Sequence, residues 1–225
     1  MQKSFKYYDI ILAVFAAVLL ISNLAGTKLI AFGPITTDGG AVLFPLAYIL
    51  GDVLTEIYGY KYTRRAIWAA FGIMLLAVAA FTVVRYMPPA PEYTAQASYE
   101  AVLGFFPRIV AASLAAFLTG SFLNSFVLAK LKVKTKGEKL WLRLIGSTFV
   151  GEFFDTVVFA LVAFGGILQG TGMLVYILIG WLFKTGVEVV CLPITYRVIG
   201  KMKQIEKIDI YDNKTDFTIF RVDVR

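Results

Sequence analysis

The sequence predicts an all-α integral membrane protein with six transmembrane helices. Hydrophobic residues make up 59% of the 225 residues and charged residues only 16%, a balance that ordinary soluble domains do not have. The apolar residues are gathered in long runs, and lysine and arginine alternate between the connections that separate these runs. The runs far exceed the ~10-residue alternating strands of membrane barrels, so helices are expected.

Six segments are each long enough to span a bilayer core of about 30 Å when some tilt is allowed. In chain order they are residues 8–30, 41–58, 65–87, 105–129, 144–168 and 172–200. The first has no clear small-residue cleavage site, so we interpret it as a retained helix and not as a signal peptide. Residues 1–200 are thus predicted to be one transmembrane domain.

Two of the connecting segments carry further predictions. The connection 88–104 contains three prolines and is expected to hold a short interfacial helix around Tyr93 to Leu103. Residues 201–225 are predicted to be a short cytoplasmic tail. Within the tail, residues 208–211 and 217–220 alternate around a turn at Asn213 and Lys214, a pattern typical of a small β-hairpin.

Basic residues predict the orientation of the helices. They lie before the first segment, between the second and third, between the fourth and fifth, and after the sixth. The other connections, 31–40, 88–104 and 169–171, contain almost none. Short cytoplasmic loops are rich in lysine and arginine, so both termini are predicted to be cytoplasmic. The net charge of +7 then sets topology, and nucleic acid is not an expected partner. The residues concerned are Lys3, Lys6, Lys61, Arg64, Arg65, Lys130, Lys132, Lys134, Lys136, Lys139, Lys201, Lys203 and Lys207.

Short motifs recur in the two halves of the chain. Asn23 is followed by Lys28 in the first segment, and Asn124 is followed by Lys130 in the fourth. Gly-Asp at 51–52 in the second segment corresponds to Gly-Glu at 151–152 in the fifth. Two halves of three spans have opposite orientations, so the pattern predicts a 3+3 inverted repeat with a binding site near the repeat interface. Chance similarity is the competing interpretation.

Acidic side chains inside apolar segments are the main candidates for a site. Asp52 and Glu56 are four residues apart, and Glu152 and Asp155 are three apart, so each pair shares a helix face. A charge at the bilayer centre costs roughly 2.5–3.5 kcal/mol on insertion scales, which predicts that these acids face a polar interior site. For Glu56, a place beside basic residues at the cytoplasmic interface is an equal alternative.

Lys184 and Glu188 are four residues apart in the last segment, where Lys184 falls near the middle of the membrane. The lysine needs a carboxylate partner, either Glu188 or an acid of another span. Asn23 can both donate and accept hydrogen bonds and so suits a polar ligand, although helix–helix contact is its alternative role. The predicted substrate-binding residues are Asn23, Asp52, Glu56, Glu152, Asp155, Lys184 and Glu188.

The chain contains no histidine and a single cysteine, Cys191. Histidine-ligated metals and imidazole relays are therefore excluded, and no cofactor or metal is expected. An intramembrane enzyme would need a metal or an activated nucleophile, which makes it a distant alternative.

The quoted motifs, together with residues 51–59, Arg64-Arg65, residues 151–156 and Phe183-Lys184, resemble the queuosine precursor transporter family, formerly described as vitamin uptake transporters. The resemblance covers essentially the whole chain. It implies an importer of deazaguanine bases in a prokaryotic cytoplasmic (inner) membrane, serving salvage into the queuosine of transfer RNA.

The main alternative is a vitamin-binding component that docks on a separate ATPase module of an energy-coupling-factor transporter. Ala13 and Ala17 are four residues apart and could form the docking face. The sequence leaves the oligomeric state open, with a homodimer as one option.

Overall fold

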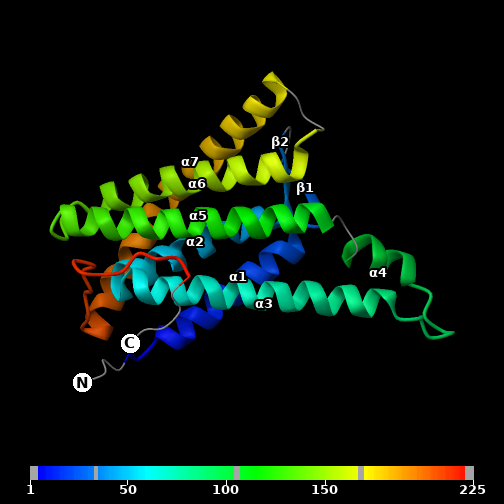
Figure 1. The fold of residues 1–225 in the computed structure, drawn as a ribbon, viewed down its shortest axis with the longest axis horizontal. Coiled ribbons are helices and arrows are strands. Elements are labelled where there is room, and N and C mark those ends of the chain that lie inside the picture. Colours follow the sequence, from blue (N-terminus) through cyan, green and yellow to red (C-terminus); the bar gives the residue numbers. More distant parts are fainter. Residues whose placement is uncertain (1–4, 33–34, 104–106, 167–169, 221–225) are drawn as a thin grey trace.

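The computed structural model describes residues 5–32, 35–103, 107–166 and 170–220 (Figure 1). Within these ranges, five helices are long and apolar enough to cross a membrane. They are α1 (Tyr8–Ala25), α3 (Tyr60–Tyr86), α5 (Pro107–Lys134), α6 (Leu140–Phe164) and α7 (Thr171–Glu206). The chain is thus a mainly helical membrane protein, as predicted.

The segment 41–58 differs from the other five predicted spans. It consists of a 3-10 turn η1 (Gly39–Val42), a helix α2 of 10 residues (Phe44–Val53) and a π-helical turn η2 (Leu54–Tyr58). Gly59, with φ 78°, separates this segment from α3, because only glycine adopts such a dihedral without a steric penalty. Pro45 stands in the first turn of α2, where proline is tolerated, and not in the interior of a long helix.

The predicted end of the first helix needs correction. This helix ends at Ala25, and an antiparallel pair of strands, β1 (Leu29–Phe32) and β2 (Ile35–Asp38), follows where the end of the helix and a loop were expected. The isoleucine, threonine and phenylalanine content of this stretch favours strands. The short helix of the connection 88–104 is confirmed as α4 (Gln96–Leu103).

The C-terminal tail does not form the predicted hairpin. Helix α7 continues to Glu206, and residues 208–220 contain no strand. The tail's backbone pairs with the bundle instead, since Arg64 of α3 donates to the carbonyl of Asp216 (2.9 Å) and Trp68 donates to that of Ile219 (2.9 Å).

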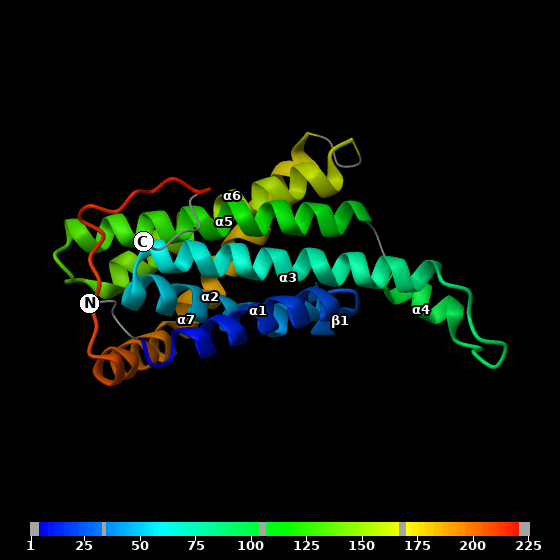
Figure 2. The same cartoon turned by 60° about the horizontal axis from the view of Figure 1, so that its bottom comes forward.

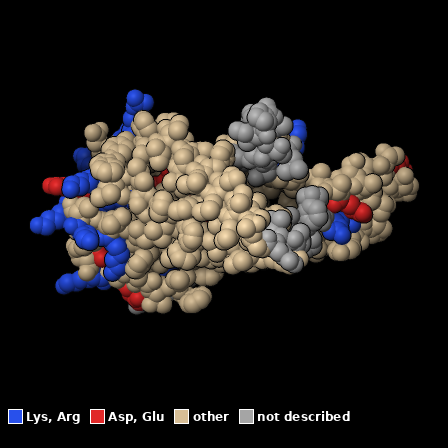
Figure 3. Space-filling model, turned by 90° about the horizontal axis from the view of Figure 1, so that it is seen from above, with Lys and Arg blue, Asp and Glu red and all other residues tan. Residues whose placement is uncertain are grey.

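The start of α1, the end of α7 and the α5–α6 turn lie at the same end of the bundle (Figure 2). Lysine and arginine side chains gather at this end (Figure 3), which we call the basic end. Along the bundle, large apolar side chains are exposed, for example Leu76 of α3 (69%) and Val190 of α7 (78%). In a membrane protein, lipid covers such side chains.

Helices α5 and α6 lie side by side (Figure 1) and approach very closely at two glycines. A Cβ atom added to Gly151 would lie 2.7 Å from the Cβ of Asn124, and one added to Gly120 would lie 2.7 Å from the Cβ of Asp155. Small residues allow membrane helices to pack backbone against backbone. The two glycines therefore set the positions of Asn124 and Asp155.

Gly151→Ala is expected to lower the free energy of unfolding by about 1–3 kcal/mol, the usual cost of overpacking. The added methyl group must push α5 away from α6. Thermal unfolding of the purified protein in detergent measures the effect. Gly72→Ala in α3 is the matched control, since its Cβ would meet nothing within 4 Å, and it should leave the unfolding temperature unchanged or raise it.

Candidate functional site

Three charged side chains meet in the middle of the bundle: Glu152 and Asp155 of α6 and Lys184 of α7. The Lys184 ammonium lies 3.4 Å from Glu152 Oε2 and donates a hydrogen bond to Asp155 Oδ2. Glu152 is twelve residues into α6, about 18 Å along its axis. We call this group the lysine cluster. Two carboxylates share one ammonium group there, so the cluster has more hydrogen-bond acceptors than Lys184 can satisfy.

Helix α2 contributes Tyr48 to the lysine cluster. The side chains of Tyr48 and Glu152 are hydrogen-bonded, so an aromatic ring lies beside the acid. Among the aromatic residues next to the acids in sequence, Phe154 and Phe183 are 42% and 48% exposed and point outward. The sequence alone could not distinguish Tyr48 from these others, because the distinction depends on how α2 packs against α6.

Asp52 of α2 and Glu188 of α7 form a second group, which we call the carboxyl pair. Their side chains lie within hydrogen-bonding reach of each other, and they are only 1% and 5% exposed. Asn124 Nδ2 donates to Asp52 Oδ1 (3.0 Å), and Thr148 Oγ1 donates to Glu188. The intrahelical pairing of Lys184 with Glu188 that the spacing allowed is not formed, because Lys184 turns to α6.

Glu56 lies apart from both groups, at the basic end. This fully buried side chain accepts from Arg143 Nη2 at 2.6 Å and Lys203 Nζ at 2.7 Å, with Lys132 Nζ at 3.8 Å. The three cations come from α6, α7 and α5. We call Glu56 and its three partners the basic-end clamp. Sequence reasoning expected basic neighbours from the α2–α3 connection, whereas the partners are distant in the chain.

Asn23 also lies away from the lysine cluster. Its Nδ2 donates to the Leu19 carbonyl (2.9 Å) and its Oδ1 accepts from Ser113 of α5 (2.8 Å). These contacts join α1 to α5, the alternative role that its sequence allowed. Asn124 of α5 also joins two helices, since it reaches Asp52 of α2 in the carboxyl pair.

The C-terminal tail is tied to the basic-end clamp through Asp209. This carboxylate forms ion pairs with Lys132 and Lys203, the latter at 2.9 Å. Partial burial alone would raise its pKa, but the hydrogen bonds from both lysines lower the pKa of Asp209 below its usual range. A carboxylate whose pKa is lowered by folding stabilises the tail contact above its unfolded pKa of ~3.9, and the stabilisation is lost as the pH falls through the folded value.

We therefore expect the tail to stay docked at neutral pH, to loosen only below about pH 4, and to loosen already at neutral pH in Asp209→Asn. The mobility of a spin label at Asn213→Cys, in a Cys191→Ser background, measures docking. Glu138→Gln, an exposed acid at the same end, is the control and should leave the label immobile. A label that is equally mobile in the parent and in Asp209→Asn at neutral pH would contradict this role of Asp209.

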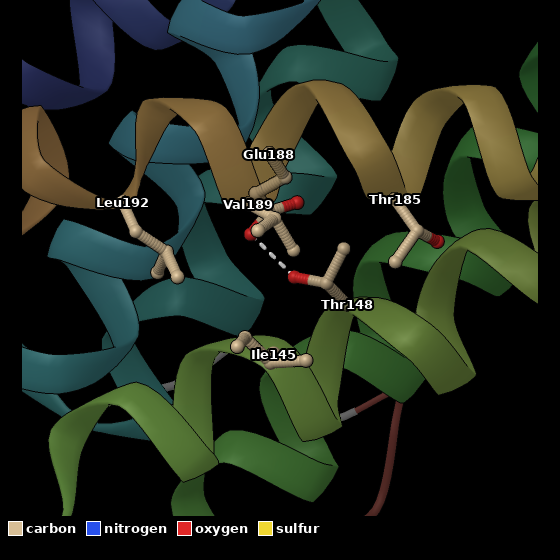
Figure 4. A pocket seen from close by; sticks show the side chains of 6 residues that line it. All are labelled: Ile145, Thr148, Thr185, Glu188, Val189 and Leu192. Carbon is tan, nitrogen blue, oxygen red and sulfur yellow. Dashed lines mark hydrogen bonds between the residues drawn. The ribbon is translucent and has the colours of Figure 1, made fainter.

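A small hollow opens beside the carboxyl pair, between α6 and α7 (Figure 4). It has no room for even a water-sized sphere, whereas typical ligand pockets hold roughly 300–1,000 Å³. Its lining residues are Ile145, Thr148, Thr185, Glu188, Val189 and Leu192. A two-ring ligand does not fit in this hollow.

Comparison with known proteins identifies the family. A profile described as "Putative vitamin uptake transporter" matches residues 38–198. The chain belongs to this family. The match includes both acidic groups and Glu56, but not Asn23.

Two curated members of this transporter family are similar to the chain. One is the "Probable queuosine precursor transporter" of Bacillus subtilis (strain 168), 32% identical over 176 residues, which is 78% of this chain and 77% of that protein. The other is the "Queuosine precursor transporter" of Escherichia coli (strain K12), 30% identical over 128 residues, or 57% and 55% of the two chains. No solved structure matches the chain.

Membership in the vitamin uptake transporter family makes the chain a transporter of a small molecule and not an enzyme. The resemblance inferred from the motifs alone is thereby confirmed.

Proposed function

We propose that the chain imports a queuosine precursor, a deazaguanine base, across a prokaryotic cytoplasmic membrane. The observation that carries the proposal is the lysine cluster, partly buried mid-bundle in a chain whose relatives bear that function in their names. Salvage into transfer RNA would consume the imported base.

The chemistry of the lysine cluster suits such a ligand. A guanine-like base presents a ring N–H and an exocyclic amine side by side, and one carboxylate can accept from both. Glu152 or Asp155 is the proposed acceptor. The carbonyl of the base needs a donor, which Lys184 supplies, and the ring of Tyr48 beside Glu152 offers a flat apolar contact.

The proposed architecture has six spans, with residues 41–58 as the short second span and both termini cytoplasmic. A short span interrupted by a π turn is typical of transporters, whose discontinuous helices line the substrate site. The gathering of basic residues at the end that holds the start of α1 and the end of α7 supports this orientation. An inverted repeat would pair α2 with α6, and the contact between Tyr48 and Glu152 joins these two helices.

The orientation predicts a labelling pattern. In intact cells carrying Cys191→Ser, a cysteine at Glu92 should react with an impermeant thiol reagent, because the α3–α4 connection is proposed to be external. A cysteine at Lys134 should react only after the cells are opened. The reverse pattern would contradict cytoplasmic termini.

A second candidate is the substrate-binding component of an ATP-driven vitamin transporter. Ala13 and Ala17 are both exposed on α1, as a docking face for an ATPase module requires. Transport of a labelled base by this chain alone in proteoliposomes separates the two proposals. A homodimer is compatible with either of them.

The test of import uses a bacterial strain that cannot make deazaguanine precursors and lacks its own importer. Expression of this chain should restore queuosine in transfer RNA at a low external concentration of the base. Absence of rescue despite normal membrane insertion, or rescue of a thiamine- or biotin-dependent phenotype alone, would overturn the proposal.

A further inference from the structure

The proposed contacts to the base do not involve the carboxyl pair, whose members are 1% and 5% exposed. Asp52 Oδ2 and Asn124 Oδ1 are buried and receive no hydrogen bond from any donor in the described ranges. The carboxyl groups of Asp52 and Glu188 are nevertheless in contact. Two ionised carboxylates in contact repel each other, whereas a single shared proton lets one carboxyl group donate a hydrogen bond to the other.

Among the described residues, no cation forms a salt bridge with the carboxyl pair. In the described part of the chain, Lys184 forms its salt bridges with Glu152 and Asp155, and no lysine or arginine forms one with Asp52 or Glu188. The other groups that surround the pair are acids, neutral donors or a phenol. They are Glu152 and Thr148 on α6, Tyr48 on α2, Asn124 on α5 and, one turn along from Asp52, Glu56, which is paired with the cations of the basic-end clamp.

Glu188 also lines the small hollow between α6 and α7. The hydroxyl groups of Thr148 and Thr185 line this hollow together with Glu188 (Figure 4). Thr185 Oγ1 is buried without a hydrogen-bond partner in the described structure. Hydroxyl groups therefore flank Glu188 on this side, and a hydroxyl group can both donate and accept a hydrogen bond.

We propose that Asp52 and Glu188 form a proton-binding site that couples import of the base to the proton gradient. This inference rests on the proposed function. A carboxylate of the pair binds a proton from the outer side as the lysine cluster binds the base. When the site opens inward, the proton and the base are both released to the cytoplasm. No bond of the base is broken, and nothing is oxidised or reduced.

The first experiment needs no substrate. Infrared spectra of the purified protein at neutral pH should contain the carbonyl band of a buried protonated carboxylic acid. The band should disappear in Asp52→Asn/Glu188→Gln and persist in Glu100→Gln, an exposed acid on α4. A band that is absent from the parent, or unchanged in the double variant, would overturn the proton site.

The second experiment uses proteoliposomes with an imposed pH gradient, acidic outside. The parent should accumulate labelled base above its equilibrium level and carry protons inward with it. Asp52→Asn and Glu188→Gln should still exchange base between the two sides at equal concentration. Their accumulation of labelled base should be at least ten-fold lower than that of the parent. Glu100→Gln should accumulate like the parent.

The outcomes separate the two proposals. If the parent neither accumulates nor exchanges labelled base in proteoliposomes, the proposed function fails. If the parent moves base but ignores the pH gradient, or if the two variants still accumulate it, import stands and proton coupling at this pair is overturned.

Discussion

Lys184→Met is expected to abolish uptake of the base and to destabilise the bundle. Methionine keeps much of the length of lysine but leaves the buried Glu152 and the partly buried Asp155 without their cation. Removing one partner of a fully buried ion pair typically costs about 3–5 kcal/mol, and the cost is expected to be smaller here because the side chains of Lys184 and Asp155 are 25% and 19% exposed. Lys184 is also the proposed donor to the carbonyl of the base. The substitution therefore removes a contact to the base in addition to lowering the stability of the folded protein.

Uptake of labelled base by cells and thermal unfolding of the purified protein measure the two effects of Lys184→Met. Lys201→Met, on the same helix but exposed at the basic end, is the control and should retain both uptake and stability. Lys184→Arg keeps the charge and should recover stability more than uptake, because the larger guanidinium occupies space that the base needs. Uptake by Lys184→Met equal to the parent's would show that the cluster only joins α6 to α7.

Glu56→Gln is expected to open the basic end of the protein. Neutralising this fully buried carboxylate leaves the cations of α5, α6 and α7 close together without their common partner. The loss is again about 3–5 kcal/mol by the same reasoning, and repulsion among Lys132, Arg143 and Lys203 should separate the helix ends. In a protein with cytoplasmic termini, this change favours the state open to the cytoplasm.

Labelling of cysteines measures the opening. A cysteine at Ser147, which is buried near the clamp on α6, should react with a thiol reagent from the basic end faster in Glu56→Gln than in the parent. Glu138→Gln at the same end should react like the parent. Equal rates in all three proteins would mean that the clamp does not close this end.

The long helices could be predicted from the sequence because a run of about 20 apolar residues has few alternatives in lipid. Residues 41–58 contain as much apolar character, but Gly39, Gly40 and Gly59 lie at the edges of this stretch, which contains only 10 residues of α-helix. Hydropathy counts apolar residues and does not register where the backbone turns. The five-span count among the described helices follows from this one segment.

The sequence identifies candidate site residues as charged residues inside apolar segments. This pattern correctly brings together Glu152, Asp155 and Lys184, which meet in the structure. It applies equally to Glu56, which lies in the basic-end clamp instead. The difference depends on Arg143 and Lys132, which are distant in sequence and reach Glu56 only after α5 and α6 have packed. Likewise, the described part of the tail forms no hairpin, and Arg64 and Trp68, both distant in sequence, donate hydrogen bonds to its carbonyl groups.

Equilibrium binding of a labelled deazaguanine base to the purified chain tests the central claim most directly. The account predicts saturable binding by the parent. Asp155→Asn, which keeps the shape but removes the charge, should weaken binding by about 1.5–3 kcal/mol, or roughly ten-fold or more, and Glu100→Gln should bind like the parent. If Asp155→Asn, Glu152→Gln and Lys184→Met all fold and bind the base as tightly as the parent, the lysine cluster is a structural network and the base binds elsewhere.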